Sequence, residues 1–101
     1  MKFEFKNKNL IELYTEGKSK KYKFLNKVEI NKFMIAVGII ESAANINDFR
    51  KMSSLNFEHL NGNRYSMRLS RQNRLEMLIE WEDENKTLGT IYLDDITKHY
   101  E

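Results

Sequence analysis

The sequence predicts an α+β domain in which an N-terminal strand and two helices pack on an antiparallel four- to five-stranded sheet. Two patterns predict this class: apolar residues recur at helical spacing in the first half of the chain, and they alternate with polar residues in the second half. The length of 101 residues suits one domain over 1–101 and is too short for a second domain with its own core. We expect the helices to cover one face of the sheet and to leave the other face free for a ligand.

A strand and a short helix are expected first. Residues 2–6 alternate charged and aromatic side chains, which is the period of a half-buried strand. Asn7 is suited to cap the start of the helix that follows, and Gly17 stands where a left-handed C-terminal cap belongs.

A second, longer helix is expected after a lysine-rich connection. Apolar residues recur over 30–40 at the i, i+3, i+4, i+7 positions, and two alanines allow the helix to continue to Asn45. Asn47 or Asp48 is then expected to cap one further turn, which ends at Met52.

The second half of the chain predicts a meander of antiparallel strands. Asn61-Gly62-Asn63 is a strong hairpin-turn signal, because asparagine and glycine tolerate positive φ. In the strand after this turn, Tyr65 and Met67 alternate with polar residues, which places Arg68 on the open face. The four strands of the meander are expected over residues 57–60, 65–69, 75–81 and 88–93.

Composition narrows the possible function classes. The chain is 41% hydrophobic and 32% charged, which is typical of a folded globular protein. The absence of cysteine excludes disulfides and thiolate metal sites, and only two histidines and no glycine-rich phosphate loop argue against a metal or cofactor, so none is expected. The longest apolar run, Phe33 to Ile40, is far shorter than the roughly 20 residues that span a bilayer. We expect a cytoplasmic protein with no membrane contact.

Positive charge is concentrated in two stretches. Residues 1–51 carry 11 Lys/Arg and 6 Asp/Glu, whereas residues 52–101 carry 6 and 9. The lysines between Glu16 and Glu29 are typical of a solvated surface. Four of the five arginines fall within eleven residues, which favours an anion-binding surface because guanidinium matches phosphate geometry. The two stretches contain Lys18, Lys20, Lys21, Lys23 and Lys27, and Arg64, Arg68, Arg71 and Arg74.

Several stretches occur in an order that points to a family. They are Phe57-Glu-His-Leu-Asn-Gly, Tyr65-Ser-Met-Arg-Leu, Asn73-Arg-Leu and the ending His99-Tyr100. Over nearly the whole chain, this order resembles the HigB-like branch of the RelE toxins, which belong to bacterial type II toxin–antitoxin systems. The resemblance implies a ribosome-dependent mRNA endoribonuclease, or mRNA interferase, that inhibits translation. It also implies a helix-turn-helix, HigA-like antitoxin as partner, with operator DNA contacted only through that antitoxin.

Metal-independent RNA cleavage requires a base for the 2′-hydroxyl proton, cations for the phosphate and an acid for the leaving oxygen. Arg68 and Arg74 are the candidates for the phosphate clamp, with surface salt bridges to Glu76 or Glu80 as the competing interpretation. The resemblance makes His99 the candidate acid or base, and Tyr100 a residue that stacks on a base or carries a proton. His59 is a second proton carrier if its strand presents it to the same face.

The remaining candidate RNA contacts are cationic or lie at the hairpin turn. The lysines are candidates for phosphates of 16S ribosomal RNA, and the others for the message. Asn61 stands where the family's turn usually has lysine, Glu58 stands where a histidine often occurs, and the family's terminal Tyr-His order is reversed. These RNA-binding candidates are Lys18, Lys20, Lys21, Lys23, Asn61, Arg64 and Arg71.

Two other functions remain open at the level of sequence. One is a ParE-like toxin that binds DNA gyrase instead of cutting RNA. Such a toxin would be indicated by loss of the basic residues and of the His/Tyr pair. The other is a non-catalytic protein that binds only the antitoxin as a co-repressor, which Asn61 favours.

Overall fold

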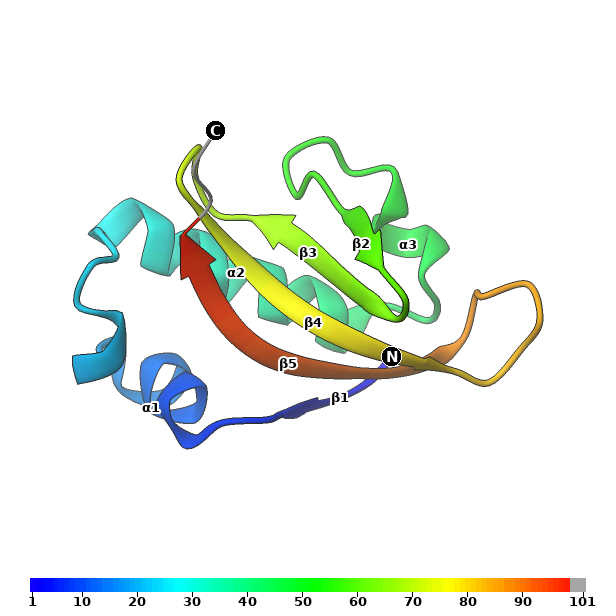
Figure 1. The fold of residues 1–101 in the computed structure, drawn as a ribbon, viewed down its shortest axis with the longest axis horizontal. Helices are drawn as coiled ribbons and strands as arrows, with labels where there is room; N and C mark the ends of the chain where they lie inside the picture. The colour runs from blue at the N-terminus through cyan, green and yellow to red at the C-terminus, as the bar shows by residue number, and fades with distance from the viewer. Residues whose placement is uncertain (99–101) are drawn as a thin grey trace.

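A single curved sheet with helices against one face organises the chain, as Figure 1 shows for a computed structural model that describes residues 1–98. The strands lie in the order β1-β5-β4-β3-β2. The elements are β1 (Lys2–Phe5), α1 (Lys8–Glu16), the 3-10 turn η1 (Lys20–Tyr22), α2 (Lys27–Ser42), α3 (Asn47–Arg50), β2 (Glu58–Asn61), β3 (Arg64–Arg68), β4 (Asn73–Trp81) and β5 (Gly89–Lys98).

The α+β class is confirmed, but the sheet is mixed rather than wholly antiparallel. Strands β2 to β5 form the expected antiparallel meander. The first strand, β1, pairs in parallel with the last, β5, with Phe3 opposite Ile91 and Phe5 opposite Leu93. The chain crosses the helical face after β1 and enters the meander at the far edge, so β1 meets the strand farthest from it in sequence. Residue alternation predicts which face a side chain takes and carries no information on strand direction.

The caps of α1 are those that the sequence predicts. The side-chain oxygen of Asn7 accepts a hydrogen bond from the Leu10 amide at 2.8 Å, and Gly17 adopts the left-handed conformation at φ 76°. An asparagine side chain satisfies one of the amides that a helix start leaves unpaired, and glycine takes positive φ without a steric penalty.

Helix α2 ends at Ser42, before the expected Asn45. Ala43 is already extended, at φ −69° and ψ 136°. The Asp48 carboxylate accepts the Ala44 amide at 2.6 Å, and the N-terminal amine donates to the Ala43 carbonyl, so tertiary contacts replace the helical ones. The expected cap of the next turn is wrong as well, because α3 is capped by Ile46, not by Asn47 or Asp48.

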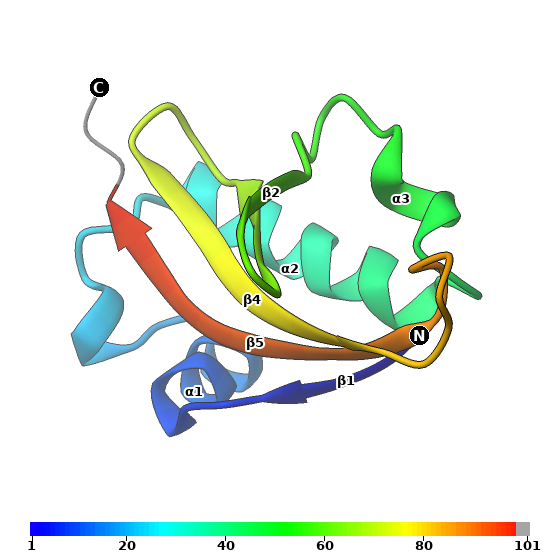
Figure 2. The ribbon, with the colours of Figure 1, turned by 45° about the vertical axis from the view of Figure 1, so that its right-hand side comes forward.

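Helix α2 lies against the covered face of the sheet, as Figure 2 shows, and the core lies between the two. Phe33, Val37 and Ile40 of α2 have no exposed surface, nor do Met77 of β4 and Leu93 of β5. Burial of such side chains, at about 25 cal/mol per Å² of apolar surface, is the main term that stabilises the fold. Within residues 1–98, no helix has both the length and the apolar character that crossing a membrane requires.

Strand β5 continues to Lys98, five residues past its expected end at Leu93. Its pairing with β4 contains a bulge, since Met77 faces Leu93 whereas Glu76 faces Asp95. A bulge places one extra residue on one strand and re-aims the side chains around it. It therefore brings acidic residues of β5 to the open face, where the candidate site lies.

Candidate nucleic-acid interface

Arg68 and Arg74 form a cross-strand pair on the open face of the sheet. The register sets them opposite each other at the ends of β3 and β4. Their neighbours Met67 and Leu75 are fully buried on the other side, so alternation directs both arginines away from the core. Arg71 is exposed in the turn between the two strands. We call residues 68–74 the arginine loop.

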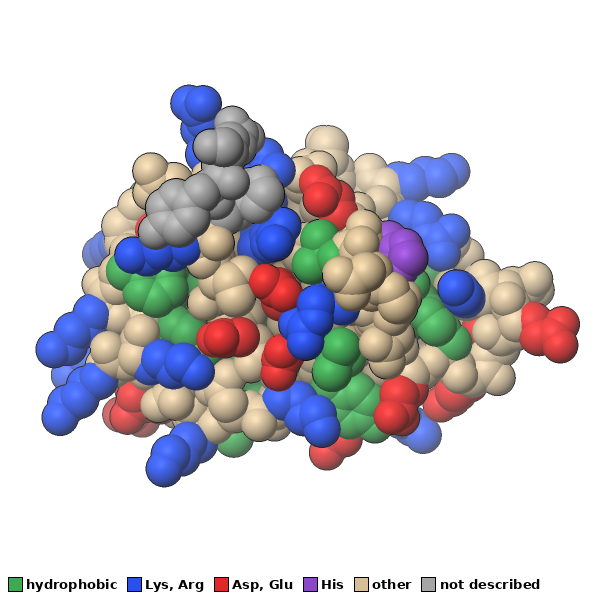
Figure 3. Space-filling model, viewed as in Figure 1, with side chains coloured by type: hydrophobic (Ala, Val, Ile, Leu, Met, Phe, Trp, Pro, Cys, Tyr) green, Lys and Arg blue, Asp and Glu red, His purple; other side chains and the backbone are tan. Residues whose placement is uncertain are grey.

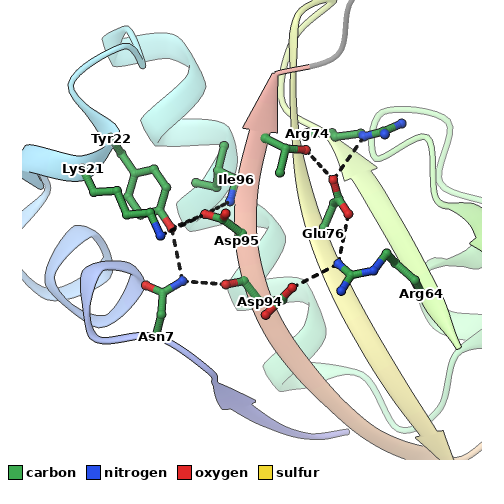
Figure 4. A network of polar contacts seen from close by, with 10 residues as sticks. Asn7, Lys21, Tyr22, Arg64, Arg74, Glu76, Asp94, Asp95 and Ile96 are labelled. Carbon is green, nitrogen blue, oxygen red and sulfur yellow. Dashed lines mark hydrogen bonds and ion pairs between the residues drawn. The ribbon is translucent and has the colours of Figure 1, made fainter.

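Carboxylates lie among these arginines, as Figure 4 shows for Arg64 and Arg74. The Arg64 guanidinium donates to Glu76 and to Asp94, at 3.0 Å each. The Arg74 Nε lies 3.6 Å from the Glu76 carboxylate, and the Arg68 guanidinium lies 3.9 Å from the Glu58 carboxylate.

The three arginines consequently differ in how far their charge is compensated. The hydrogen bond to Asp94, together with that to Glu76, raises the pKa of Arg64 although its partial burial opposes the rise. Arg68 is the least compensated, because its pair with Glu58 is long and both side chains are about two-fifths exposed, at 39% and 45%. Of the three, Arg68 is the one most available to a phosphate.

Glu76 and Asp94 belong to this site. Glu76 is one of the two salt-bridge partners that the sequence offers for Arg68 or Arg74, and it lies beside Arg74. Asp94 was not predicted, because it lies beyond the expected end of its strand. Glu76 is buried and also accepts a hydrogen bond from Thr97, so Arg64, Arg74 and Thr97 surround it. The sequence signal for Asp94 was a pair of consecutive acids directly after the apolar strand.

The lysine-rich connection, residues 18–26, is here called the lysine loop, and it packs beside the end of β5. The Tyr22 hydroxyl donates to Asp95 at 2.6 Å, and the Lys21 amine lies 3.7 Å from the same carboxylate (Figure 4). Burial raises the pKa of the Tyr22 hydroxyl and its bond to Asp95 raises it further, so the hydroxyl stays protonated as a donor. The Lys98 amine lies 5.0 Å from the ring centre of Phe24.

A hollow of about 450 Å³ lies between α1 and the lysine loop. Lys18, Lys20 and Lys23 line it. Glu12 and Glu16 of α1 line it too, so these lysines share their surroundings with carboxylates rather than forming a purely basic patch.

The lysine loop and the arginine loop meet at one end of the molecule. Lys98, which contacts the lysine loop through Phe24, is paired with Asn73 of the arginine loop. Figure 3 shows Lys and Arg side chains gathered along this end, whereas acidic and basic side chains alternate over the centre of the same face. Two basic stretches that are far apart in sequence thus form one basic end.

His59 lies on the opposite side of the sheet from the arginines. It pairs with Tyr65, a core-facing residue, and the two ring centres are 4.8 Å apart. Its Nε2 lies 2.7 Å from the Gly62 carbonyl, and its ring lines a pocket of about 360 Å³ with Phe57 and Trp81. The condition under which His59 would be a proton carrier at the arginine site is therefore not met.

The other predicted residues lie at the two ends of β3 or outside the described chain. Asn61 is exposed and pairs with Arg64, so it lies at the end of β3 away from Arg68. His99 and Tyr100 fall outside residues 1–98. The described chain ends at Lys98, beside the strand that carries Arg74.

Comparison with solved structures identifies the fold. Over 99% of this chain and 100% of the other, the structure matches a YoeB/ParE toxin from Agrobacterium tumefaciens, with a TM-score of 0.55 and 10% sequence identity. The chain has the fold of a YoeB/ParE toxin. No family model matches the sequence, and no curated protein does. At 10% identity the likeness describes the arrangement of the YoeB/ParE fold and not its activity.

Proposed function

We propose that this chain is the toxin of a type II toxin–antitoxin pair and acts as a metal-independent mRNA endoribonuclease on the ribosome. The observation that carries the proposal is the Arg68–Arg74 pair at the basic end of a fold shared with a YoeB/ParE toxin. Paired guanidinium groups match the oxygens of one phosphate, and their fixed positive charge stabilises the charge that develops on it during cleavage.

In this proposal, two arginines of the sheet bind the phosphate, and two residues at positions 99 and 100 handle the protons or the base. Arg68 binds the scissile phosphate most directly, and Arg74 assists it from the neighbouring strand. His99 is the proposed general acid or base and Tyr100 stacks on a base or carries a proton, as the family resemblance implies. His59 takes no part at the phosphate, since it faces away. No cofactor enters this scheme.

The proposed partners follow from the same surface and from the resemblance. The lysine loop contacts phosphates of 16S ribosomal RNA, and the ribosome presents the message to the arginine loop. A helix-turn-helix, HigA-like antitoxin neutralises the toxin, and operator DNA is reached only through it.

One observation favours a second candidate, a non-catalytic protein that binds the antitoxin as a co-repressor. Glu76 and Asp94 neutralise Arg64, and Glu76 also lies beside Arg74. A surface with compensated charge attracts phosphate less strongly than a free basic one. The gyrase-binding alternative differs from both, because it would change the DNA and leave the messages intact.

The test is expression of the chain without a partner, followed by mapping of cut sites on cellular mRNA and on programmed ribosomes. We expect translation to stop and messages to be cut. Intact messages with broken or relaxed DNA would instead support gyrase binding, and growth without either effect would support the co-repressor.

Arginine variants link the activity to the site. Arg68→Ala and Arg74→Ala are expected to abolish cleavage while unfolding free energy changes by less than about 0.5 kcal/mol for Arg68, which lies on the surface. Arg50→Ala is the matched control, because Arg50 is exposed in α3 and lies outside the basic end. Loss of folding in the Arg68 variant would assign that residue a structural role.

A further inference from the structure

Glu29, in the first turn of α2, is a buried carboxylate that touches two separate segments. Its Oε1 accepts the backbone N–H of Asn26, the last residue of the lysine loop, at 2.8 Å. Its Oε2 accepts the hydroxyl of Ser70 at 2.6 Å and the side-chain amide of Asn73, both in the arginine loop. The Glu29 side chain is thus bonded to both basic segments at once.

Helix capping alone does not require this arrangement. A capping box uses one carboxylate oxygen to accept the cap residue's amide, which Oε1 of Glu29 does. The other oxygen is commonly solvated, whereas Glu29 is only 5% exposed and its Oε2 is bonded to a residue 44 positions away. Burial acts to raise the pKa of this carboxyl, but the hydrogen bonds from Asn26, Ser70 and Asn73 outweigh it and lower the pKa.

The arginine loop is itself closed by hydrogen bonds that meet at the residues bound to Glu29. The Ser70 hydroxyl accepts the amides of Gln72 and Asn73, at 3.2 and 3.1 Å. The Asn73 carbonyl accepts the amides of Leu69 and Ser70, at 2.9 and 3.1 Å. Fixing Ser70 and Asn73 therefore fixes the turn whose ends are Arg68 and Arg74.

We propose that Glu29 is a positioning residue, which holds the lysine loop and the arginine loop in one fixed relation so that both contact the same RNA. Its role toward RNA rests on the proposed function, whereas the coupling of the two loops does not. Without Glu29, each loop would keep its cations but lose its orientation relative to the other, and fewer phosphates would be contacted together.

A polarity exchange tests this coupling without changing side-chain size. Glu29→Gln places an amide donor against the Asn73 amide, and Asn73→Asp places a second carboxylate against Glu29. In the double variant Glu29→Gln/Asn73→Asp, the new amide at position 29 can donate to the new carboxylate at position 73. The hydrogen bond is restored, and the negative charge has moved to position 73. Glu41→Gln is the matched control, since Glu41 is exposed at the other end of α2.

The first measurement is amide hydrogen exchange in the folded variants. Both single variants are expected to exchange about tenfold faster at Asn26 and at Gln72 and Asn73, because each loses a hydrogen bond to a buried charge. The double variant is expected to recover protection in both loops, and the Glu41 control to match the parent chain. Faster exchange in only one loop would overturn the proposal, as would single variants that exchange like the parent.

The second measurement is the salt dependence of binding to a labelled single-stranded RNA oligonucleotide. The logarithm of affinity falls against the logarithm of salt by about 0.7 per phosphate contact, so a shallower slope reports lost contacts. Single variants are expected to have shallower slopes, with recovery in the double variant, and an unchanged slope despite faster exchange would overturn the positioning role. The two proposals can fail separately. If the parent chain neither binds nor cuts RNA, but the single variants exchange faster in both loops and the double variant recovers, the proposed function fails and the coupling of the loops stands.

Discussion

The covered face and the open face of the sheet use the same strands but are stabilised differently. On β4, Leu75, Met77 and Ile79 point into the core and are at most 1% exposed. Between them, Glu76 points outward into a group of arginines. The covered face is stabilised by apolar burial, and the open face by charges that compensate one another.

This difference explains why the open face can carry a function. A cavity or an unpaired polar group in an apolar core lowers the unfolding free energy. The side chains of the covered face are therefore constrained by folding and are not free to serve a binding site. An exposed ion pair such as Arg68–Glu58 contributes little stability, typically less than about 1 kcal/mol, so it can exchange partners when a phosphate arrives, whereas the buried Glu76 contributes more. The predictions that follow test this contrast, beginning with the largest expected effect.

The contrast is sharpest at two adjacent residues of β4. Met77→Ala is expected to lower the unfolding free energy by about 2–5 kcal/mol, because it leaves a cavity in the core. Leu78→Ala, on the half-buried outward side, is expected to lower it by clearly less. Urea unfolding measures both, and equal losses would show that the two faces do not differ as described.

Charge added at the hairpin turn tests where the reacting phosphate is contacted, because Asn61 lies at the end of β3 away from Arg68. If the proposed function holds and the phosphate is contacted at this turn, Asn61→Lys raises the single-turnover cleavage rate on programmed ribosomes, because a missing transition-state donor costs on the order of 3 kcal/mol. Gly62 keeps the positive φ of 50° that the turn requires. Asn63→Lys, in the same exposed turn, is the control. An unchanged or lower rate would place the cationic role elsewhere, with Arg64 or Arg71 as the next candidates.

Charge removed from the open face is expected to shift stability and RNA affinity in opposite directions. Glu76→Gln weakens the bonds to Arg64 and Arg74, so unfolding free energy falls by about 1–3 kcal/mol. The arginines become free for phosphate, so RNA binding tightens and its salt slope steepens. Glu80→Gln, exposed on the same strand, is the control. Weaker RNA binding in the Glu76 variant would mean that this carboxylate organises the site rather than competing in it.

Acid is expected to release the contact between the two loops. The pKa of Glu29 in the folded chain lies below the reference value of 4.5, so ionised Glu29 stabilises the fold above that pH. This stabilisation is lost as pH falls through the lowered pKa. Chemical unfolding across the acidic range should show a smaller decline in the Glu29→Gln variant than in the parent or in Glu41→Gln. If stability falls equally with acid in the parent chain, in Glu29→Gln and in Glu41→Gln, ionised Glu29 does not stabilise the fold as described.

Local patterns in the sequence correctly predicted features that depend on neighbouring residues. The caps at Asn7 and Gly17, and the outward direction of Arg68, follow from hydrogen bonding and alternation within a few residues. The same alternation contained the answer for His59, because Phe57 two residues before it is apolar and faces inward. The role of His59 depended on its strand presenting it to the arginine face, and this period of two already argued against that condition.

The sequence by itself determined which segments form the main helices and strands and which face of its strand Arg68 takes, because these depend on periods of two and 3.6 residues. It did not determine where α2 and β5 end. Only the tertiary structure decided the parallel pairing of β1, the bulge beside Asp94 and the bonds from Glu29 to Ser70 and Asn73. Those features join residues far apart in the chain, and their register depends on how all the elements pack together. The basic end is therefore a product of packing, although each of its cations is visible in the sequence.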